Sequence, residues 1–304
     1  MKRVYIGGYG PGIVTVGGGL TRVASPSFLA AHPTLPVLYA AGELERGWLT
    51  AFRVGETLDV LDERPSEGSL PCHIAVDPTG SVLAAANYGD GVAVVYRLDD
   101  RGAFEGEPIV LRHQGSGPDP ERQEGPHAHE AVFHDGILHV SDLGTDEIRR
   151  YRYDGTALEP IRLEPGTGPR HFAFSGSRLY VAGELAGTVT LIEDGRHTVV
   201  PASRAEDKEG GKNAPSHLQL ADDLVYVANR GPDTVTVLRA ADLSHVAEVP
   251  AGGEWPRHFA VDGTTMYVAG QHSDTVAAFR LKDGVPEPTG EAYEVESPAC
   301  VLIM

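Results

Sequence analysis

The sequence predicts an all-β protein, a seven-bladed β-propeller whose last blade is closed by pairing of the N- and C-terminal strands. Two observations carry this prediction. A short motif recurs along the 304 residues at the interval of a propeller blade. Glycine and proline, 37 and 22 residues, are also more frequent than in average proteins, where together they make up roughly 12%. This excess indicates many tight turns.

Each repeat begins with a proline, continues into a short apolar strand and a turn, and then enters a second apolar strand. The second strands include Leu179-Tyr-Val-Ala-Gly183, and turn signals such as Asp77-Pro-Thr-Gly80 precede them. Third strands such as Thr188-Val-Thr-Leu-Ile192 follow. The repeated prolines lie 41 to 55 residues apart, at Pro26, Pro71, Pro126, Pro169, Pro215, Pro256 and Pro298. About four strands in a period of ~40–45 residues is the signature of a propeller blade.

Six repeats are complete and the seventh is split between the chain ends. The tail Ser297-Pro-Ala-Cys-Val-Leu-Ile-Met304 supplies a first strand, and Val4-Tyr-Ile-Gly-Gly8 supplies the second strand. Pairing these segments in one blade would protect two open sheet edges. We therefore expect one β-propeller domain over residues 1–304.

Composition limits the partners and the compartment. The net charge of −18 disfavours nucleic acid and anionic membrane surfaces, so neither is expected as a partner. The only cysteines are Cys72 and Cys300, which do not form a CxxC pair or a disulfide framework. The start of the chain lacks the apolar core of a secretory signal. These features favour the cytoplasm.

The repeat also predicts where a ligand binds. In an antiparallel blade, the start of the first strand and the end of the second lie at the same sheet edge. Residues that follow the repeated prolines and residues that close the second strands are therefore expected at one mouth of the central channel. Positions that break the blade symmetry are the better candidates for binding one asymmetric ligand. They are His127, Arg170, Glu184, Arg230 and Arg257.

The second residue after the repeated proline is a histidine in four blades, and we interpret this histidine column as structural. It contains His73, His171, His217 and His258, which we expect to bond neighbouring blades. His127-x-His129 has a spacing compatible with metal, but no third ligand is evident, so no metal is predicted. Neither cysteine has an evident base for thiol catalysis.

Arginines at one channel mouth allow two interpretations. Arginine binds carboxylate and phosphate in bidentate fashion, so a small anionic metabolite, a carboxylate or a phosphate, is the expected partner. Alternatively, the arginines form ion pairs between blades with Glu43, Asp142 or Glu184. Two long loops are expected on the same side of the propeller as this channel mouth. One contains Arg122, and the other, residues 202–214, contains Lys208 and Lys212.

Several sequence motifs resemble those of one known family. They are Asn87-Tyr-Gly-Asp-Gly91, Pro126-His-Ala-His129, Gly168-Pro-Arg-His171, Asn229-Arg-Gly231 and Trp255-Pro-Arg-His258. That family, the seven-bladed lactonases, includes propeller-type 6-phosphogluconolactonases and fungal 3-carboxy-cis,cis-muconate lactonizing enzymes. The resemblance covers essentially the whole chain.

The resemblance implies an active site at the channel mouth. Carried over to matching positions, its catalytic groups are His127 or His129, Arg170, Glu184 and Arg257. The family usually has Asn before the glutamate, whereas Gly183 stands there in this chain. Residues around these groups are expected to contact the substrate; they are Tyr88, Arg122, Asp142, Arg230 and Gln271.

The sequence thus predicts a metal-independent lactonase without a cofactor that hydrolyses a small anionic sugar lactone. Arg170 and Arg257 would bind the anionic group or stabilise the tetrahedral oxyanion. Glu184 or His127 would accept a proton from water. One alternative is a cycloisomerase that closes a muconate to a lactone. Another is a non-catalytic binding module, although the Gly-His and Trp-Asp pattern of WD40 repeats is absent.

Overall fold

The computed structural model describes residues 2–205 and 211–304. Over these residues the chain forms strands β1 to β28 and a single 3-10 segment, η1 (Gln271–Ser273). The predicted all-β class is therefore confirmed. Within the same residues, no helix has the length and apolar character needed to cross a bilayer.

The described residues divide into two compact units, which we treat separately. The first unit extends to Gly168 and includes Met304, and the second is Pro169–Ile303. The expectation of one domain over residues 1–304 stays a prediction. Among the described residues the strands form seven four-stranded antiparallel sheets, the number predicted from the repeats.

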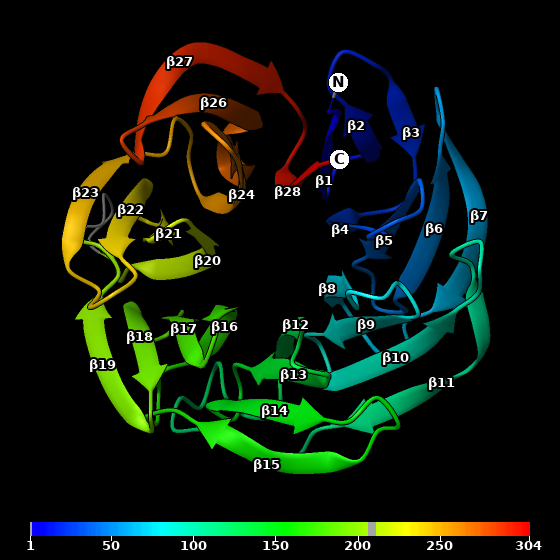
Figure 1. Cartoon of the computed structure of the whole chain (residues 1–304), viewed down its shortest axis with the longest axis horizontal. Coiled ribbons are helices and arrows are strands. Elements are labelled where there is room, and N and C mark those ends of the chain that lie inside the picture. Colours follow the sequence, from blue (N-terminus) through cyan, green and yellow to red (C-terminus); the bar gives the residue numbers. More distant parts are fainter. Residues whose placement is uncertain (1, 206–210) are drawn as a thin grey trace. The chain divides into compact units, whose positions relative to one another are not determined.

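The first unit contains three complete blades and the strands at the start of the chain. In each complete blade four consecutive strands pair side by side in chain order (Figure 1). Its strands are β1 (Val4–Gly8), β2 (Gly12–Thr15), β3 (Leu20–Arg22), β4 (Pro26–Ala31), β5 (Val37–Gly42), β6 (Trp48–Val54), β7 (Leu58–Pro65), β8 (Pro71–Val76), β9 (Val82–Asn87), β10 (Val92–Leu98), β11 (Phe104–Arg112), β12 (Ala128–His134), β13 (Ile137–Asp142), β14 (Glu147–Tyr151) and β15 (Ala157–Arg162).

The second unit contains three further complete blades and the last strand. The same consecutive pairing holds in each blade. Its strands are β16 (Pro169–Ser175), β17 (Arg178–Gly183), β18 (Thr188–Glu193), β19 (Arg196–Pro201), β20 (Ala214–Ala221), β21 (Leu224–Arg230), β22 (Thr234–Arg239), β23 (His245–Pro250), β24 (Pro256–Asp262), β25 (Thr265–Gly270), β26 (Thr275–Lys282), β27 (Val285–Glu294) and β28 (Pro298–Ile303).

The chain ends meet as the sequence predicts. Met304, which follows β28, exchanges two backbone hydrogen bonds with Arg3, which precedes β1, at N···O distances of 2.7 and 3.0 Å. Each end therefore satisfies backbone groups that would otherwise lie at an open sheet edge.

The repeated prolines mark the start of first strands. Proline is the first residue of β4, β8, β16, β24 and β28, a position where the missing N–H breaks no ladder bond. Second strands are buried on both faces; every residue of β5 and β9 is buried. This double burial explains why they appear in the sequence as continuous apolar runs.

The residue before the repeated proline adopts a left-handed backbone in several blades. Its φ is +59° at Gly168, +57° at Trp255 and +43° at Ser297. In all three cases its N–H donates to a carboxylate oxygen of an aspartate between the second and third strands of the blade just completed, at 2.7, 2.8 and 2.7 Å. These aspartates are Asp146, Asp233 and Asp274. The bond fixes the turn from which each first strand begins.

The tyrosine of the second-strand motif joins consecutive blades. In the first unit the Tyr39 hydroxyl donates to the carbonyl oxygen of Gly102 at 2.7 Å. In the second unit, Tyr180 and Tyr226 bond in the same way to Ala240 and Gly284, also at 2.7 Å. Burial, and then the carboxylates Asp222 and Asp223, raise the pKa of Tyr226 to about 12. The Tyr226 phenol therefore stays protonated and acts as a permanent donor.

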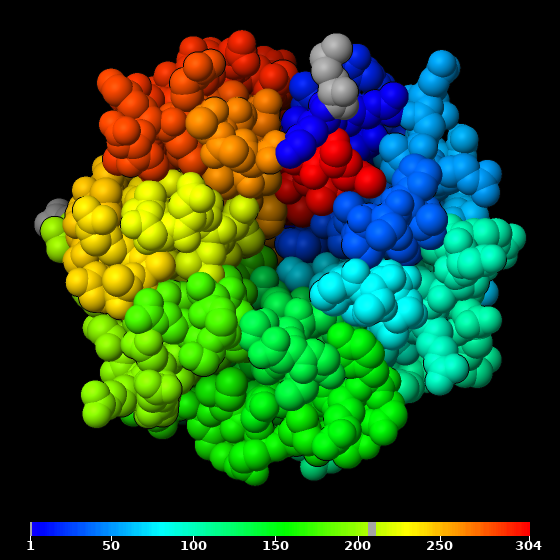
Figure 2. All heavy atoms as spheres, in the orientation of Figure 1, coloured from blue at the N-terminus to red at the C-terminus, as the bar shows by residue number. Residues whose placement is uncertain are grey.

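Apolar side chains from adjacent blades fill the space between them. In the first unit β4 packs against β8, and β8 against β12. One buried cluster there combines Tyr39, Leu49, Ile74, Leu83 and Val94 from two blades. Figure 2 shows the blue, cyan and green residues of this unit in contact with one another. The blades thus share their cores.

Candidate functional site

In the second unit, three predicted site residues converge. Arg170 is the second residue of β16, Glu184 follows β17, and Arg230 ends β21. The Nε atom of Arg170 lies 2.8 Å from Glu184 Oε2, and Nη2 of Arg230 lies 2.7 Å from the same oxygen. All three residues are buried, with exposed fractions of 2%, 6% and 6%. The Arg230–Glu184 pair joins two blades, as one alternative expected, whereas the Arg170–Glu184 pair lies within one blade.

The two arginines are also anchored to the backbone of β20. Arg170 donates through Nη1 to the carbonyl oxygen of Ser216, and Arg230 donates through Nε to that of Ala214 at 2.9 Å. Two guanidinium groups thus lie against one carboxylate oxygen in a buried position. Arginine is the side chain that binds carboxylate and phosphate in bidentate fashion.

Arg257 and Gln271 lie in the next blade of the same unit. Arg257, the second residue of β24, donates through Nη1 to Gln271 Oε1 at 3.4 Å, and both side chains are partly exposed. Sequence reasoning missed two neighbours. The guanidinium carbon of Arg230 lies 5.3 Å from the centroid of the Trp255 ring, and the His272 ring stacks on Trp255 at 4.9 Å. Trp255 stands within the motif Trp255-Pro-Arg-His258, but nothing in the sequence assigns its ring a role.

Two of the four repeated histidines, His73 and His258, bond the next blade, as predicted. His73 Nδ1 accepts from the N–H of Ala131 at 3.4 Å, and His258 Nδ1 accepts from Val301 at 3.3 Å, each in the next blade. His217 stacks on His258 with ring centroids 4.0 Å apart. Burial, and then the charge of Arg170, lower the pKa of His258 to about 3. This imidazole is therefore neutral and serves as an acceptor.

A second group of predicted residues lies in the first unit. The rings of Tyr88 and His127 stack with centroids 4.6 Å apart and planes 22° apart. Arg122 donates through Nη2 to the Tyr88 hydroxyl at 3.2 Å. The loop that carries Arg122 is anchored by the buried Gln123, which donates to the carbonyl oxygen of Leu143 at 2.9 Å. The structure thus brings Tyr88, Arg122 and His127 together.

The two ring nitrogens of His127 have different partners. Nδ1 lies 2.8 Å from the carbonyl oxygen of Tyr88, and Nε2 lies 3.1 Å from Oε1 of Glu124. A carbonyl oxygen only accepts, so Nδ1 carries a proton. Nε2 is therefore the nitrogen that gains or loses one. Glu124, absent from the predicted residues, stands three positions before His127 on the same loop, which was the available signal.

His129 has a different environment from His127. Its ring meets Tyr88 edge-on with centroids 5.6 Å apart, and its Nδ1 lies 3.8 Å from Sγ of Cys72. Cys72 is buried, and its thiol also lies 3.3 Å from the carbonyl oxygen of His129. The sequence reading that Cys72 has no nearby base is corrected by this contact. His127, which has one nitrogen next to an exposed carboxylate, is the better candidate for proton transfer.

Asp142 does not have the expected substrate contact. Its side chain is completely buried, with Oδ2 2.7 Å from Nδ1 of the equally buried His113. Its Oδ1 accepts from the backbone N–H of His127 at 2.8 Å and from that of Gly144 at 3.1 Å. This corrects the prediction: a carboxylate surrounded by three nitrogen atoms of its own chain holds the backbone of His127 in place.

Other predicted residues are not part of these groups. Lys212 is exposed, and Lys208 lies outside the described residues. The prediction that the groups of the first and second units serve one substrate stays a prediction.

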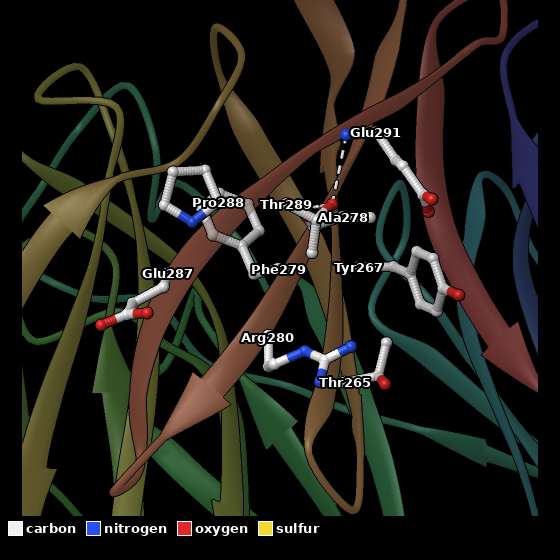
Figure 3. Close-up of a pocket in the computed structure, with 9 residues that line it drawn as sticks. All are labelled: Thr265, Tyr267, Ala278, Phe279, Arg280, Glu287, Pro288, Thr289 and Glu291. Atoms are coloured by element: carbon white, nitrogen blue, oxygen red, sulfur yellow. Dashed lines mark hydrogen bonds between the residues drawn. The ribbon is translucent and has the colours of Figure 1, made fainter.

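Two surface pockets lie away from these residues. One, of about 520 Å³, is on the blade β24–β27 of the second unit (Figure 3). Its lining comes from β25, β26 and β27 and includes Tyr267, Arg280 and Glu287. The other, of about 810 Å³ in the first unit, is lined by residues such as Arg97, Glu105 and Tyr153. Neither includes a predicted site residue, so neither bears on the candidate site.

Comparison with known proteins gives a consistent result. Residues 12–303 match a family model described as "Lactonase, 7-bladed beta-propeller". The 6-phosphogluconolactonase of Bacillus subtilis is 30% identical over 259 residues, which cover 78% of this chain and 74% of that protein. A 6-phosphogluconolactonase of Formosa agariphila is 28% identical over 263 residues, or 77% of this chain and 74% of that protein.

Solved structures agree over nearly the full length. A protein from Lactobacillus plantarum superposes with a TM-score of 0.90 at 26% identity, with complete coverage of both chains. A periplasmic gluconolactonase of Pseudomonas aeruginosa gives a TM-score of 0.89 at 25% identity, covering 99% of this chain and 98% of its own.

Proposed function

Because the chain belongs to the family of seven-bladed β-propeller lactonases, we propose that its substrate is a small anionic sugar lactone. The observation that carries this proposal is the buried Arg170–Glu184–Arg230 cluster, which places two guanidinium groups, the side chains suited to bidentate binding of an anionic group, next to each other. The names of the Bacillus and Formosa relatives point to a phosphorylated sugar lactone as the first substrate to test.

The reaction adds water to the lactone carbonyl and breaks the ring C–O bond. The products are a carboxylate and a hydroxyl, and one proton is released. A guanidinium group held in place before the reaction stabilises the tetrahedral oxyanion without the cost of reorganising solvent. Arg170, Arg230 and Arg257 are the candidates for this role and for binding the anionic group.

His127 is the better candidate for general base. Nδ1 is held by the Tyr88 carbonyl, so Nε2 is the nitrogen that would accept a proton from water, and the exposed side chain of Glu124 must turn away from it while the ring is neutral. The imidazolium that forms is then stabilised by Glu124. Glu184 accepts from two guanidinium groups, which stabilise its charged form and make it a weak base. We therefore assign Glu184 the role of holding both arginines.

The test is to follow proton release from a panel of sugar lactones with and without a phosphate group. We expect wild-type rates well above buffer and the highest kcat/KM for the phosphorylated lactone. His127→Gln, purified identically, is the control for contaminating lactonase and should lose about 10²–10⁴-fold in kcat. Wild-type rates equal to buffer for every lactone would refute the proposal.

Glu184→Gln separates arginine positioning from base catalysis. Because breaking one partner of a buried ion pair can cost ~3–5 kcal/mol, folding is checked by circular dichroism first. We expect KM to rise, since both arginines lose their shared acceptor, while the pH profile of kcat keeps its shape. A lost acid limb in that profile would instead identify Glu184 as the base.

A coupling measurement tests whether the two groups act in one reaction. The kcat/KM values of His127→Gln, Arg170→Gln and the double variant form a cycle. We expect a non-additive result, because a base is of little use without the group that stabilises the charge it creates. Additive losses would contradict a shared substrate.

The names of these relatives favour lactone hydrolysis over cycloisomerisation. We also propose a cytoplasmic location, which the buried free thiols of Cys72 and Cys300 support. Fractionation of the native host tests this location, and recovery in a periplasmic extract, the compartment of the Pseudomonas relative, would overturn it.

A further inference from the structure

Trp255 occupies a position where the backbone disfavours it. Its φ of +57° lies in the left-handed region, which glycine adopts without steric cost and in which a residue with a bulky side chain is strained. Gly168 and Ser297 hold the equivalent position in two other blades, with the same bond from the N–H to an aspartate. The turn itself therefore does not need an indole.

The backbone of Trp255 is held on both sides. Its N–H donates to Asp233 Oδ1 at 2.8 Å, and its carbonyl oxygen accepts from the N–H of Gln271 at 3.1 Å. The partly exposed ring stacks with that of His272, at 4.9 Å between centroids and 9° between planes. These contacts give the indole one orientation.

That orientation places the ring beside the guanidinium of Arg230. The guanidinium carbon lies 5.3 Å from the ring centroid, within the range of a cation–π interaction. Arg230 thus contacts the indole as well as the Ala214 carbonyl oxygen and Glu184 Oε2. The Ala214 and Glu184 contacts are polar, whereas the indole contacts the guanidinium through an aromatic ring.

We propose that Trp255 is a positioning residue: its indole, kept in spite of a strained backbone, orients Arg230 for binding the anionic group of the ligand. This inference rests on the proposed function for the nature of the ligand. The alternative is that Trp255 merely packs against the turn, in which case its removal would affect stability and leave ligand binding unchanged.

Substitutions that separate backbone strain from ring stacking test the proposal. Trp255→Gly removes the ring and the strain, Trp255→Leu removes the ring and keeps the strain, and Trp255→Phe keeps an aromatic face. Ser297→Gly is the matched control, because it relieves the same backbone conformation at a residue whose N–H also donates to an aspartate. Binding of 6-phosphogluconate, the hydrolysed product, is measured by calorimetry.

We expect Trp255→Gly to weaken binding about two- to fivefold, the range of an exposed cation–π contact, without lowering Tm. Ser297→Gly should leave binding unchanged. Trp255→Phe should restore most of the affinity, and Trp255→Leu should not. In kinetics the loss should appear in KM more than in kcat. Wild-type affinity in the Gly variant, or equal affinity of the Phe and Leu variants, would overturn the proposal.

A structural readout keeps this result separate from the proposed function. In a crystal structure of Trp255→Gly, we expect the Arg230 guanidinium to leave its position 2.7 Å from Glu184 Oε2. If it stays there, the inference is wrong whether or not the protein hydrolyses lactones. If wild type binds no product and hydrolyses no lactone while Arg230 moves in the variant, the substrate assignment fails and the positioning role stands.

The native fluorescence gives a further test in solution. The chain has two tryptophans, so Trp48→Phe leaves Trp255 as the only indole. Trp48 is 47% exposed at the start of β6, and its replacement is not expected to change activity. Titration with inorganic phosphate should change the emission of Trp255 in a saturable way. No change at concentrations that inhibit hydrolysis would contradict contact between this ring and the anion-binding arginine.

Discussion

The Nδ1 atom of His127 lies 2.8 Å from the backbone carbonyl oxygen of Tyr88. A substitution of the Tyr88 side chain cannot remove this acceptor. The proton on Nδ1 is therefore fixed by the backbone, and Nε2 is the nitrogen that exchanges a proton with water or substrate.

The first prediction concerns pH. The N–H of Glu124 itself, and then the charge of His127, hold the pKa of Glu124 below its ordinary value. Glu124 is thus a carboxylate throughout the range in which an imidazole titrates, and it favours the imidazolium. Glu124→Gln should move the acid limb of the kcat profile to lower pH, because the neutral base persists further into acid. An unchanged acid limb would contradict the pairing.

The second prediction separates the ring of Tyr88 from its hydroxyl. Tyr88→Phe keeps the stack on His127 and removes the acceptor for Arg122. Because a partly exposed hydrogen bond contributes ~0.5–1.5 kcal/mol, we expect a loss of about two- to tenfold in kcat/KM. Tyr88→Leu also removes the stack and should lose more. Equal losses in the two variants would show that the ring does not orient His127.

The third prediction treats Asp142 as structural. Asp142→Asn replaces a charged acceptor of His113 by a neutral one of the same shape. We expect the free energy of unfolding to fall by ~1.5–3 kcal/mol in urea denaturation, since bonds to charged groups are of that size. The KM of the folded variant should change little. A large rise in KM with unchanged stability would restore the original substrate-binding interpretation.

The fourth prediction concerns His258. Burial, and then Arg170, lower its pKa in the folded state to about 3, whereas an unfolded histidine titrates near ~6.5. The folded state therefore prefers the neutral ring, and its stabilising effect is complete above pH ~6.5 and is lost as pH falls toward 3.

Urea denaturation at pH 6.5 and pH 5 tests this sign. Carboxylates hardly titrate in that interval. We expect wild type to lose about 2 kcal/mol more than His258→Asn between the two values. His139, whose pKa burial and Arg150 lower to about 4, contributes equally to both proteins and cancels. Parallel pH dependences would contradict a buried neutral His258.

Sequence reasoning succeeded where a feature repeats. A proline before each first strand and an apolar run in each second strand predict the blades, because the same local geometry recurs in every repeat. Symmetry breaking then selected Arg170, Glu184 and Arg230, which the structure brings together around one oxygen. Pairing of the chain ends also followed from the pattern alone.

The partners of those residues were decided by tertiary packing. From the sequence, Trp255 is part of a motif and Asp142 is the end of a strand, but the direction of neither side chain can be predicted. Whether an aspartate at a strand end meets a ligand or a buried histidine depends on the side chain that the neighbouring loop inserts beside it. For Asp142 that side chain is His113, 29 residues away in the chain.

The sequence by itself determined the all-β class, the number of blades and the set of residues capable of binding or catalysis. These features depend only on local periodicity and residue type. Tertiary structure alone decided which nitrogen of His127 is reactive, which carboxylate holds the arginines and which ring lies against Arg230. These facts depend on distances of a few ångströms between residues far apart in sequence, and only the packing of strands and loops sets such distances.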